Sequence, residues 1–98
     1  MSTDGAVVML HGDFDARSTH EVRDVVYDTL DRHRAVVVDL SDVRAVDVTA
    51  LRLLAAATFV AHRAERRVTL RGCNGSVRRL LHRTHLIRLV HLDRATAC

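Results

Sequence analysis

One stretch, Ala35 to Ala61, constrains the fold more than any other part of the chain. It opens with Ala35–Val38, a β-branched apolar run closed by Asp39, and this predicts a strand buried on both faces. Residues 41–44 are mostly polar and are expected to form a turn. From Ala50 to about Glu65, leucine, alanine and arginine dominate, which predicts a helix. A buried strand is thus followed closely by a helix.

Short oxygen-bearing side chains, Asp47 and Thr49, lie where this helix is expected to begin. Such side chains accept hydrogen bonds from the first free N–H groups of a helix, so one interpretation is a structural cap. A helix N-terminus also favours negative charge, including phosphate. On these residues alone, a cap and a functional site both stay open.

Before this stretch, the sequence predicts one strand and one helix. Ala6–Leu10 is a short apolar run, and residues 12–15 (GDFD) are expected to form a turn after it. Ser18 and Glu21 have the spacing of a capping box, which predicts a helix start. The helix then presents one apolar stripe to the sheet, made of Val22, Val25, Val26 and Leu30.

After it, the sequence predicts another strand and another helix. Arg67–Arg71 alternates in polarity and reads as a strand that ends at Gly72. Residues 74–76 (NGS) are expected to form a turn and a helix cap, with Ser76 capping. The apolar stripe of that helix is Val77, Leu80 and Leu81, and residues 86–92 are expected to form a short turn and a last edge strand.

The alternation of strands and helices predicts one α/β domain over residues 1–98, with a mixed, mostly parallel sheet of about four strands and helices packed on it. The strand at Ala35–Val38 should be central. The core is expected to contain Leu51, Leu54, Phe59, Val22, Val26, Val37 and Leu80.

Composition agrees with a single folded domain, since 48% of the residues are hydrophobic and 28% are charged. No apolar run approaches the ~20 residues of a membrane span, and no signal peptide opens the chain, so a cytoplasmic protein is expected. Cys73 and Cys98 are the only cysteines, which favours unpaired thiols over a disulfide framework, although one shared disulfide stays open.

Charge is distributed unevenly along the sequence. Residues 1–50 contain five arginines and ten acidic residues, whereas residues 51–98 contain ten arginines and two acidic residues. Such an asymmetry suits a charge-matched protein interface, and solvated surface faces would give the same count.

Other site chemistries find little support. His62, His82 and His85 have no third ligand at a metal-binding spacing, so neither a metal nor a cofactor is expected. No nucleophile motif is present, so the protein is not expected to be an enzyme. Seven arginines could contact nucleic acid, but their half of the chain has one aromatic, Phe59, which is expected to be buried. These arginines are Arg66, Arg67, Arg71, Arg78, Arg79, Arg83 and Arg88.

The order Asp-Leu-Ser, a spacer, then Asp-x-hydroxyl-x-Leu opening an apolar helix resembles the STAS domains of bacterial anti-sigma-factor antagonists. Their usual motif there is D-S-S-G-L, whose second Ser is the phosphoacceptor. By this resemblance Asp47 matches the Asp, Thr49 the phosphoacceptor and Leu51 the Leu, while Val48 and Ala50 replace a Ser and the Gly. The domain looks trimmed at both ends, because the family's first strand and closing helix look missing or truncated.

The resemblance implies partner switching. The unphosphorylated domain would bind an anti-sigma factor, typically a GHKL-type serine/threonine kinase, and free a sigma factor until Thr49 is phosphorylated. The resemblance also places Asp13 and Asp15, in the GDFD segment that matches the family's G-E-L-D, near the switch as contacts for partner arginines. The remaining implied partner contacts surround the phosphoacceptor and are Asp47, Val48, Ala50 and Arg52.

Two alternatives of other classes stay open. One is a STAS scaffold or sensor module that is never phosphorylated and belongs to a signalling or lipid-transport complex; the replacements Val48 and Ala50 favour it. The other is an arginine-rich nucleic-acid binder, whose affinity would fall steeply with salt.

Overall fold

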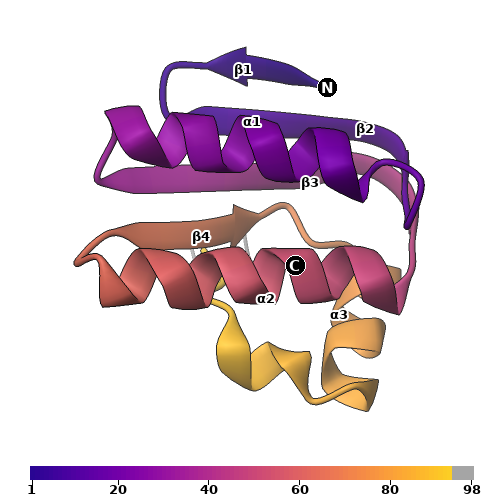
Figure 1. The fold of residues 1–98 in the computed structure, drawn as a ribbon. Coiled ribbons are helices and arrows are strands. Elements are labelled where there is room, and N and C mark those ends of the chain that lie inside the picture. Colours follow the sequence, from indigo (N-terminus) through magenta and orange to yellow (C-terminus); the bar gives the residue numbers. More distant parts are fainter. Residues whose placement is uncertain (94–98) are drawn as a thin grey trace.

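A computed structural model describes residues 1–93 of the protein, and strands and helices alternate along them (Figure 1). The strand order is β1-β2-β3-β4, with β1 antiparallel to β2 and the other two pairs parallel. The predicted α/β class and the mixed, mostly parallel sheet are therefore confirmed. In chain order the elements are β1 (Ser2–Asp4), β2 (Val7–Phe14), α1 (Thr19–Arg32), β3 (Ala35–Val46), α2 (Val48–Arg63), β4 (Arg67–Arg71), α3 (Gly75–Arg83) and the 3-10 helix η1 (Leu86–Leu89).

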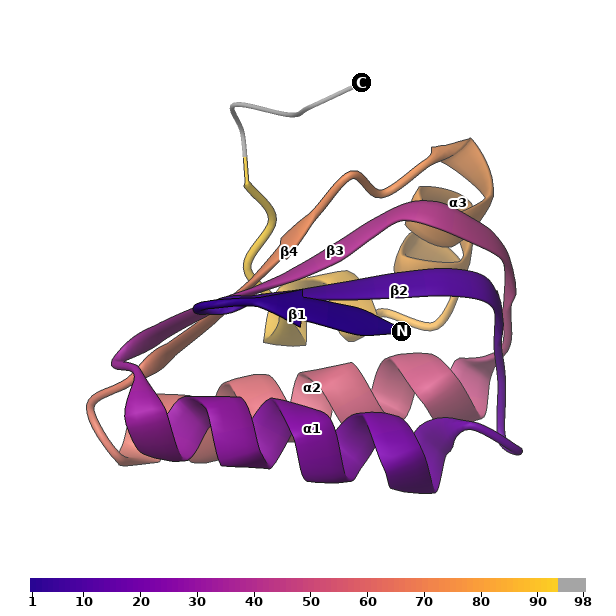
Figure 2. The same cartoon turned by 90° about the horizontal axis from the view of Figure 1, so that it is seen from above.

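Helices α1 and α2 lie side by side on one face of the sheet (Figure 2). Because successive strand side chains point to opposite faces, β3 buries every second residue: Val36, Val38 and Leu40 are at most 1% exposed. Val37 and Asp39, between them, are only partly buried. The prediction that this strand is buried on both faces is therefore wrong, since α1 and α2 cover one face.

Strands β2 and β3 run further than their apolar patterns predicted. β2 continues through Gly12 to Phe14, and β3 continues through residues 41–44 to Val46. The two strands pair along this extension, with register shifts near His11 and Gly12, so the turns predicted at 12–15 and 41–44 are wrong. The extension lies beyond the end of β4, which pairs only with residues 35–39 of β3. Ladder hydrogen bonds use the backbone, so exposed polar side chains do not interrupt this strand pair.

One apolar core lies between the sheet and the two long helices, and most of the predicted core residues belong to it. Leu80 is only partly buried and packs at its margin. Val37 is partly buried on β3 but does not belong to this core, so its predicted place in the core is wrong. The fully confirmed members are Val22, Val26, Leu51 and Leu54, each at most 4% exposed.

Phe59 does not belong to the core. Its side chain is 59% exposed, so the prediction that it is buried is wrong. Helix α2 buries Leu54, Thr58 and Ala61 at helical spacing. Phe59 is rotated about 100° from Thr58 around the helix axis, which turns it away from the sheet.

Two of the predicted helix caps differ from the observed ones. Ser18 precedes α1, but its hydroxyl donates to the carbonyl of Asp15 and caps no helix N–H group, so the capping box is not formed. At α3 the cap is Asn74, whose side chain accepts from the N–H of Val77 at 3.0 Å, while Ser76 lies within the helix. The Asn74 amide also donates to the carbonyl of Val43, which fixes α3 to the end of β3.

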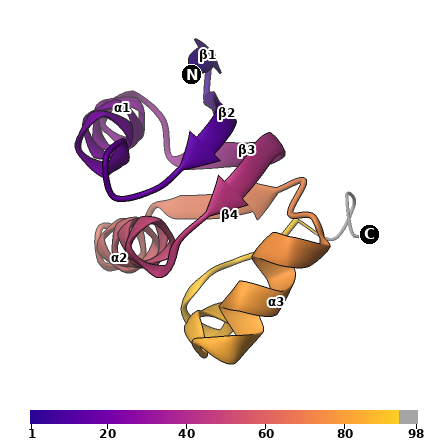
Figure 3. The same ribbon diagram turned by 90° about the vertical axis from the view of Figure 1, so that its right-hand side faces the viewer.

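Helix α3 and η1 lie beyond β4, at the edge of the sheet (Figure 3). The edge strand predicted within residues 86–92 is mostly absent, because residues 86–89 form η1 and Leu92 makes an isolated parallel bridge to Leu70. At the N-terminal end, the strand that looked missing or truncated in the sequence is present as the three residues of β1. Among residues 1–93, no helix combines the length and the apolarity needed to cross a membrane.

Candidate functional site

The N-terminus of α2 is fixed by Asp47. One carboxylate oxygen of Asp47 accepts from the N–H of Ala50 at 2.8 Å, and the other accepts from the N–H of Ala16 at 3.0 Å. The N–H of Asp47 donates to the carbonyl of Phe14 at the end of β2. Asp47 therefore acts as a structural cap that also ties α2 to the loop before α1.

Thr49 is the second residue of α2, and its side chain is exposed. The first N–H groups of a helix have no intrahelical acceptor. The N–H groups of Ala50 and Leu51 bond to Asp47, which leaves those of Val48 and Thr49 without an acceptor among residues 1–93. The Thr49 hydroxyl also has no hydrogen-bond partner among these described residues. A free hydroxyl thus lies at the positive end of a helix dipole.

A hollow of about 310 Å³ adjoins Thr49 between α1 and α2. The α1 wall contributes Arg23 and His20, whose side chains lie 2.8 Å apart (Nη2 to Nδ1), and the α2 wall contributes Arg52. Two positively charged side chains therefore line the hollow, and one of them, Arg23, also lies 3.9 Å from the Asp24 carboxylate. Sequence reasoning found Arg52 but missed Arg23 and His20. They lie on another helix, and no spacing in the sequence reveals which turn of α1 packs beside Thr49.

The other residues around Thr49 differ in accessibility. Ala50 is completely buried, so its methyl group faces the core and leaves the approach to the Thr49 hydroxyl open. Val48 is partly buried and packs at the core margin. Of the predicted partner contacts next to Thr49, Arg52 is exposed and therefore offers the largest accessible surface.

Neither of the two predicted acidic contacts lines the Thr49 hollow. Asp13 is exposed, lies 3.9 Å from Arg44 and lines a separate hollow of about 190 Å³ between β2 and α1. Asp15 pairs within the chain with Arg17, at 2.8 Å from Nη2 to Oδ2. The side-chain hydrogen bond from Arg17 lowers the pKa of Asp15, so this carboxylate is ionised at neutral pH.

The metal-ligand, arginine and cysteine candidates in the sequence form no second site in the part of the chain that the structure describes. Within residues 1–93, no group of three or more His, Cys, Asp or Glu side chains could hold a metal ion. Arg66 donates to the carbonyl of Leu30 and so satisfies the C-terminal end of α1, which is a structural role. Cys73 is buried, and Cys98 lies outside the described residues.

The contribution of the Asp47 cap to stability can be tested by mutation. Asp47→Ala should lower the free energy of unfolding by about 0.5–2 kcal/mol, because α2 loses its cap and the loop before α1 loses an anchor. Urea unfolding followed by circular dichroism measures this change. Asp42→Ala is the control, because Asp42 is exposed and its one ion pair, with His11, is at the surface. Equal stability of the two variants would contradict a structural role for Asp47.

Comparison with known proteins places the fold among related structures. TM1081 of Thermotoga maritima, a candidate anti-sigma factor antagonist, has a TM-score of 0.76 at 23% identity, covering 93% of this chain and 81% of that chain. The unphosphorylated form of the anti-sigma factor antagonist SpoIIAA has a TM-score of 0.73 at 13% identity, covering 89% and 77%. A sulfate transporter family protein of Wolinella succinogenes has a TM-score of 0.66 at 16% identity, covering 95% and 81%.

These identities establish a shared fold and nothing further. A search of curated protein sequences finds no match. The family itself follows from the sequence, since residues 1–91 match the family described as Mlab, STAS domain. With most of its length matched and the fold in agreement, this chain belongs to the STAS domain family.

Proposed function

We propose that the protein is an anti-sigma-factor antagonist that acts by partner switching, with Thr49 as its phosphoacceptor. One observation carries the proposal: the Thr49 hydroxyl is exposed at a helix N-terminus, beside N–H groups that have no acceptor among residues 1–93 and a hollow lined by Arg23 and Arg52. This environment suits a neutral hydroxyl in one state and a phosphate in the other.

In the unphosphorylated state the N-terminus of α2 is the contact surface for an anti-sigma factor. Thr49, Arg52 and the exposed part of Val48 form its centre, and Asp47 holds the helix start in place. The partner is a GHKL-type serine/threonine kinase, and its capture releases a sigma factor in the cytoplasm.

In the phosphorylated state the complex dissociates. The Thr49 oxygen attacks the γ-phosphorus of ATP on the kinase, the bond from that phosphorus to the β,γ-bridging oxygen breaks, ADP leaves and the hydroxyl proton is released. The phosphate adds about −1.5 to −2 charges to an interface formed around a neutral group. Within the free domain the helix N-terminus and the arginines of the hollow stabilise that charge, so the fold is retained.

A switch of this kind predicts a specific pattern of modification. Incubation with the cognate kinase and ATP should add one phosphate at Thr49, detected by mass spectrometry. Thr49→Ala should stay bound to the kinase in the presence of ATP. Thr49→Glu should bind about tenfold or more weakly, because a fixed charge enters the interface.

Thr19→Ala is the matched control, since Thr19 lines the same hollow but its hydroxyl donates to the carbonyl of Ala16. This variant should be phosphorylated like the wild type. Thr58 should not react, because it is 3% exposed and its hydroxyl donates to the carbonyl of Leu54. An unmodified Thr49, with both Thr49 variants binding like the wild type, would reject the phosphorylation switch.

The acidic residues near the end of β2 predict a kinetic effect. Asp13→Asn combined with Asp15→Asn should slow association with the kinase and weaken the dependence of that rate on salt, because these charges steer a basic partner. Stopped-flow association at low and high ionic strength measures both quantities. Asp28→Asn with Asp31→Asn, on the C-terminal half of α1, changes the net charge equally and should change the rate less. Identical rates for both double variants would leave the acidic pair without a role.

A second candidate is an unphosphorylated STAS scaffold or sensor module in a signalling or lipid-transport complex. Val48 and Ala50 support it, since they replace the Ser and Gly of the antagonist motif, and the fold also occurs in a sulfate transporter family protein. The phosphorylation assay distinguishes the two candidates: a scaffold binds its partner equally well with Thr49, Ala or Glu at this position.

A further inference from the structure

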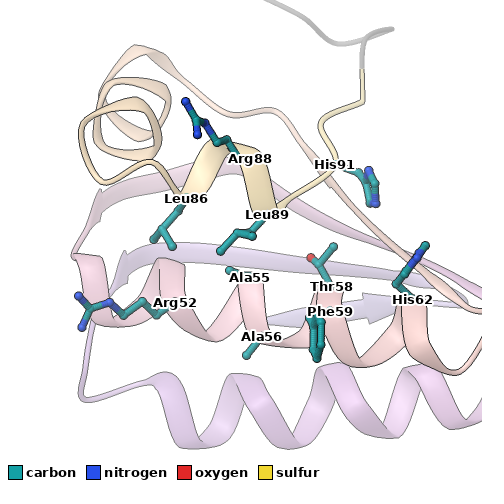
Figure 4. A pocket seen from close by; sticks show the side chains of 10 residues that line it. All are labelled: Arg52, Ala55, Ala56, Thr58, Phe59, His62, Leu86, Arg88, Leu89 and His91. Carbon is teal, nitrogen blue, oxygen red and sulfur yellow. The ribbon is translucent and has the colours of Figure 1, made fainter.

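A groove of about 520 Å³ lies between α2 and the η1 segment (Figure 4). We propose that this groove docks an amphipathic α-helix of a partner protein, with acidic residues flanking its apolar stripe. The inference goes beyond the proposed function and does not depend on phosphorylation of Thr49. The groove is lined by Arg52, Ala55, Ala56, Thr58, Phe59, His62, Leu86, Arg88, Leu89 and His91.

The walls of the groove leave large apolar side chains in water. Phe59 on α2 is 59% exposed and Leu89 on η1 is 55% exposed. Burial of apolar surface is the dominant favourable contribution to most protein association, so a partner that covers the exposed parts of both side chains is stabilised. Aromatic side chains of this kind are also frequent anchors of protein interfaces.

The bottom of the groove is apolar, and the one hydroxyl group there already has a hydrogen-bond partner. Leu86 and Ala55 are 9% and 5% exposed, and the Thr58 hydroxyl is already bonded to the carbonyl of Leu54 at 2.7 Å. Ala55 and Ala56 are small, which leaves room for inserted side chains. The depth of the groove therefore favours apolar anchors such as leucine.

The charged and ring side chains at the rim of the groove are arginines and histidines. Arg52 and His62 come from α2, and Arg88 and His91 come from the η1 side. None of the ten lining residues is acidic, and neither arginine has an ion-pair partner among residues 1–93. Carboxylates on both sides of an apolar stripe would complement this rim and orient the incoming element.

The length of the groove matches a short helix. Its α2 wall extends from Arg52 to His62, a length of about 15 Å at 1.5 Å per residue, which matches about three turns of helix. A helix satisfies its own backbone hydrogen bonds and presents a stripe at i, i+3, i+4 and i+7 to one side. A second copy of this chain is a poor occupant. Its acidic helix, α1, already buries its apolar stripe, including Val22 and Val26, in the core.

The probe for this proposal is a fluorescein-labelled, hydrocarbon-stapled twelve-residue helix with leucines at i, i+3, i+4 and i+7 and glutamates beside them. Fluorescence polarisation should give a dissociation constant in the micromolar range, that is, about −7 to −8 kcal/mol. Two peptide controls, with lysine for glutamate or serine for leucine, should bind about tenfold or more weakly. Amide shifts in NMR spectra should concentrate at Ala55, Ala56 and Leu89.

Variants of the protein assign the binding to the groove. Phe59→Ser and Arg88→Glu should each weaken the glutamate peptide about tenfold or more. Val60→Ser is the matched control, since Val60 is also exposed on α2, at 47%, but does not line the groove. Its affinity should stay within about twofold of the wild type. Circular dichroism checks that each variant is folded. Because all three residues are exposed, the folds should persist.

Four outcomes would overturn the proposal. Equal binding of the lysine and glutamate peptides, or no effect of Phe59→Ser, would remove the groove as an acidic-helix site. Concentration-dependent self-association in sedimentation velocity that Phe59→Ser abolishes would assign the groove to a second copy. Displacement of the peptide by dodecanoate at lower concentration than unlabelled peptide would assign it to an anionic amphiphile. Phosphorylation of Thr49 should be unchanged in Phe59→Ser, which separates this test from that of the switch.

Discussion

Replacing Leu54 with alanine should lower the free energy of unfolding by about 2–5 kcal/mol. Leu54 is completely buried in the middle of α2, where it packs into the core between this helix and the sheet. Its truncation removes apolar contacts and leaves a cavity that the surrounding strands cannot fill. A domain of this size has a total stability of about 5–15 kcal/mol, so the loss is a large fraction of it.

Urea unfolding at equilibrium measures the effect, read as a lower midpoint with an unchanged slope. Leu89→Ala is the matched control, because it removes the same atoms from a side chain that is 55% exposed. It should change stability by no more than about 0.5 kcal/mol. A loss below that value for Leu54→Ala would mean that α2 does not pack on the sheet through this face.

Local patterns predicted the fold well where burial dictates residue type. The stripe that contains Val22 and Val26 places α1 on the sheet, and the alternation of residues 67–71 marks β4, as observed. The extension of β3 through residues 41–44 was not predictable, because three of its four side chains are polar and exposed and Val43 alone is buried in the core. Phe59 was misplaced because its size suggested burial, whereas its angular position on α2 decides its exposure.

The residues of the candidate site that lie on one segment were predictable from the sequence, whereas those brought together by packing were not. Thr49 and Asp47 lie on the segment that begins α2, and both the cap and the exposed hydroxyl follow from their order in the sequence. Arg23 joins Thr49 only through the packing of α1 against α2, which has no signature in a single sequence. The groove beside Phe59 depends on η1, where a strand was expected.

The second large loss of stability is expected on substitution of Gly72, in the turn after β4. Gly72 has a φ of +73°, and a Cβ atom there would lie 2.8 Å from the Ser41 Cβ and 2.9 Å from the Ser41 N. Ser41 cannot move aside easily, because its N–H donates to Asp39 at 2.8 Å. Partial burial raises the pKa of Asp39, but hydrogen bonds from Ser41 and Arg71 outweigh it and lower the pKa overall. The carboxylate thus stays ionised and holds β3 and β4 together at this point.

Gly72→Ala should therefore lower the free energy of unfolding by about 2–5 kcal/mol, the combined cost of backbone strain and overpacking. Two other glycines separate these causes. Gly12 has a φ of +69° with nothing within 4 Å, so Gly12→Ala should lose only about 1 kcal/mol from strain. Gly75 begins α3, and its Cβ would meet only the flexible Arg79 side chain at 3.4 Å, so Gly75→Ala should lose nothing. Urea midpoints in the order Gly75→Ala, Gly12→Ala, Gly72→Ala, from highest to lowest, are expected; equal values for the last two would mean that β3 does not approach Gly72 this closely.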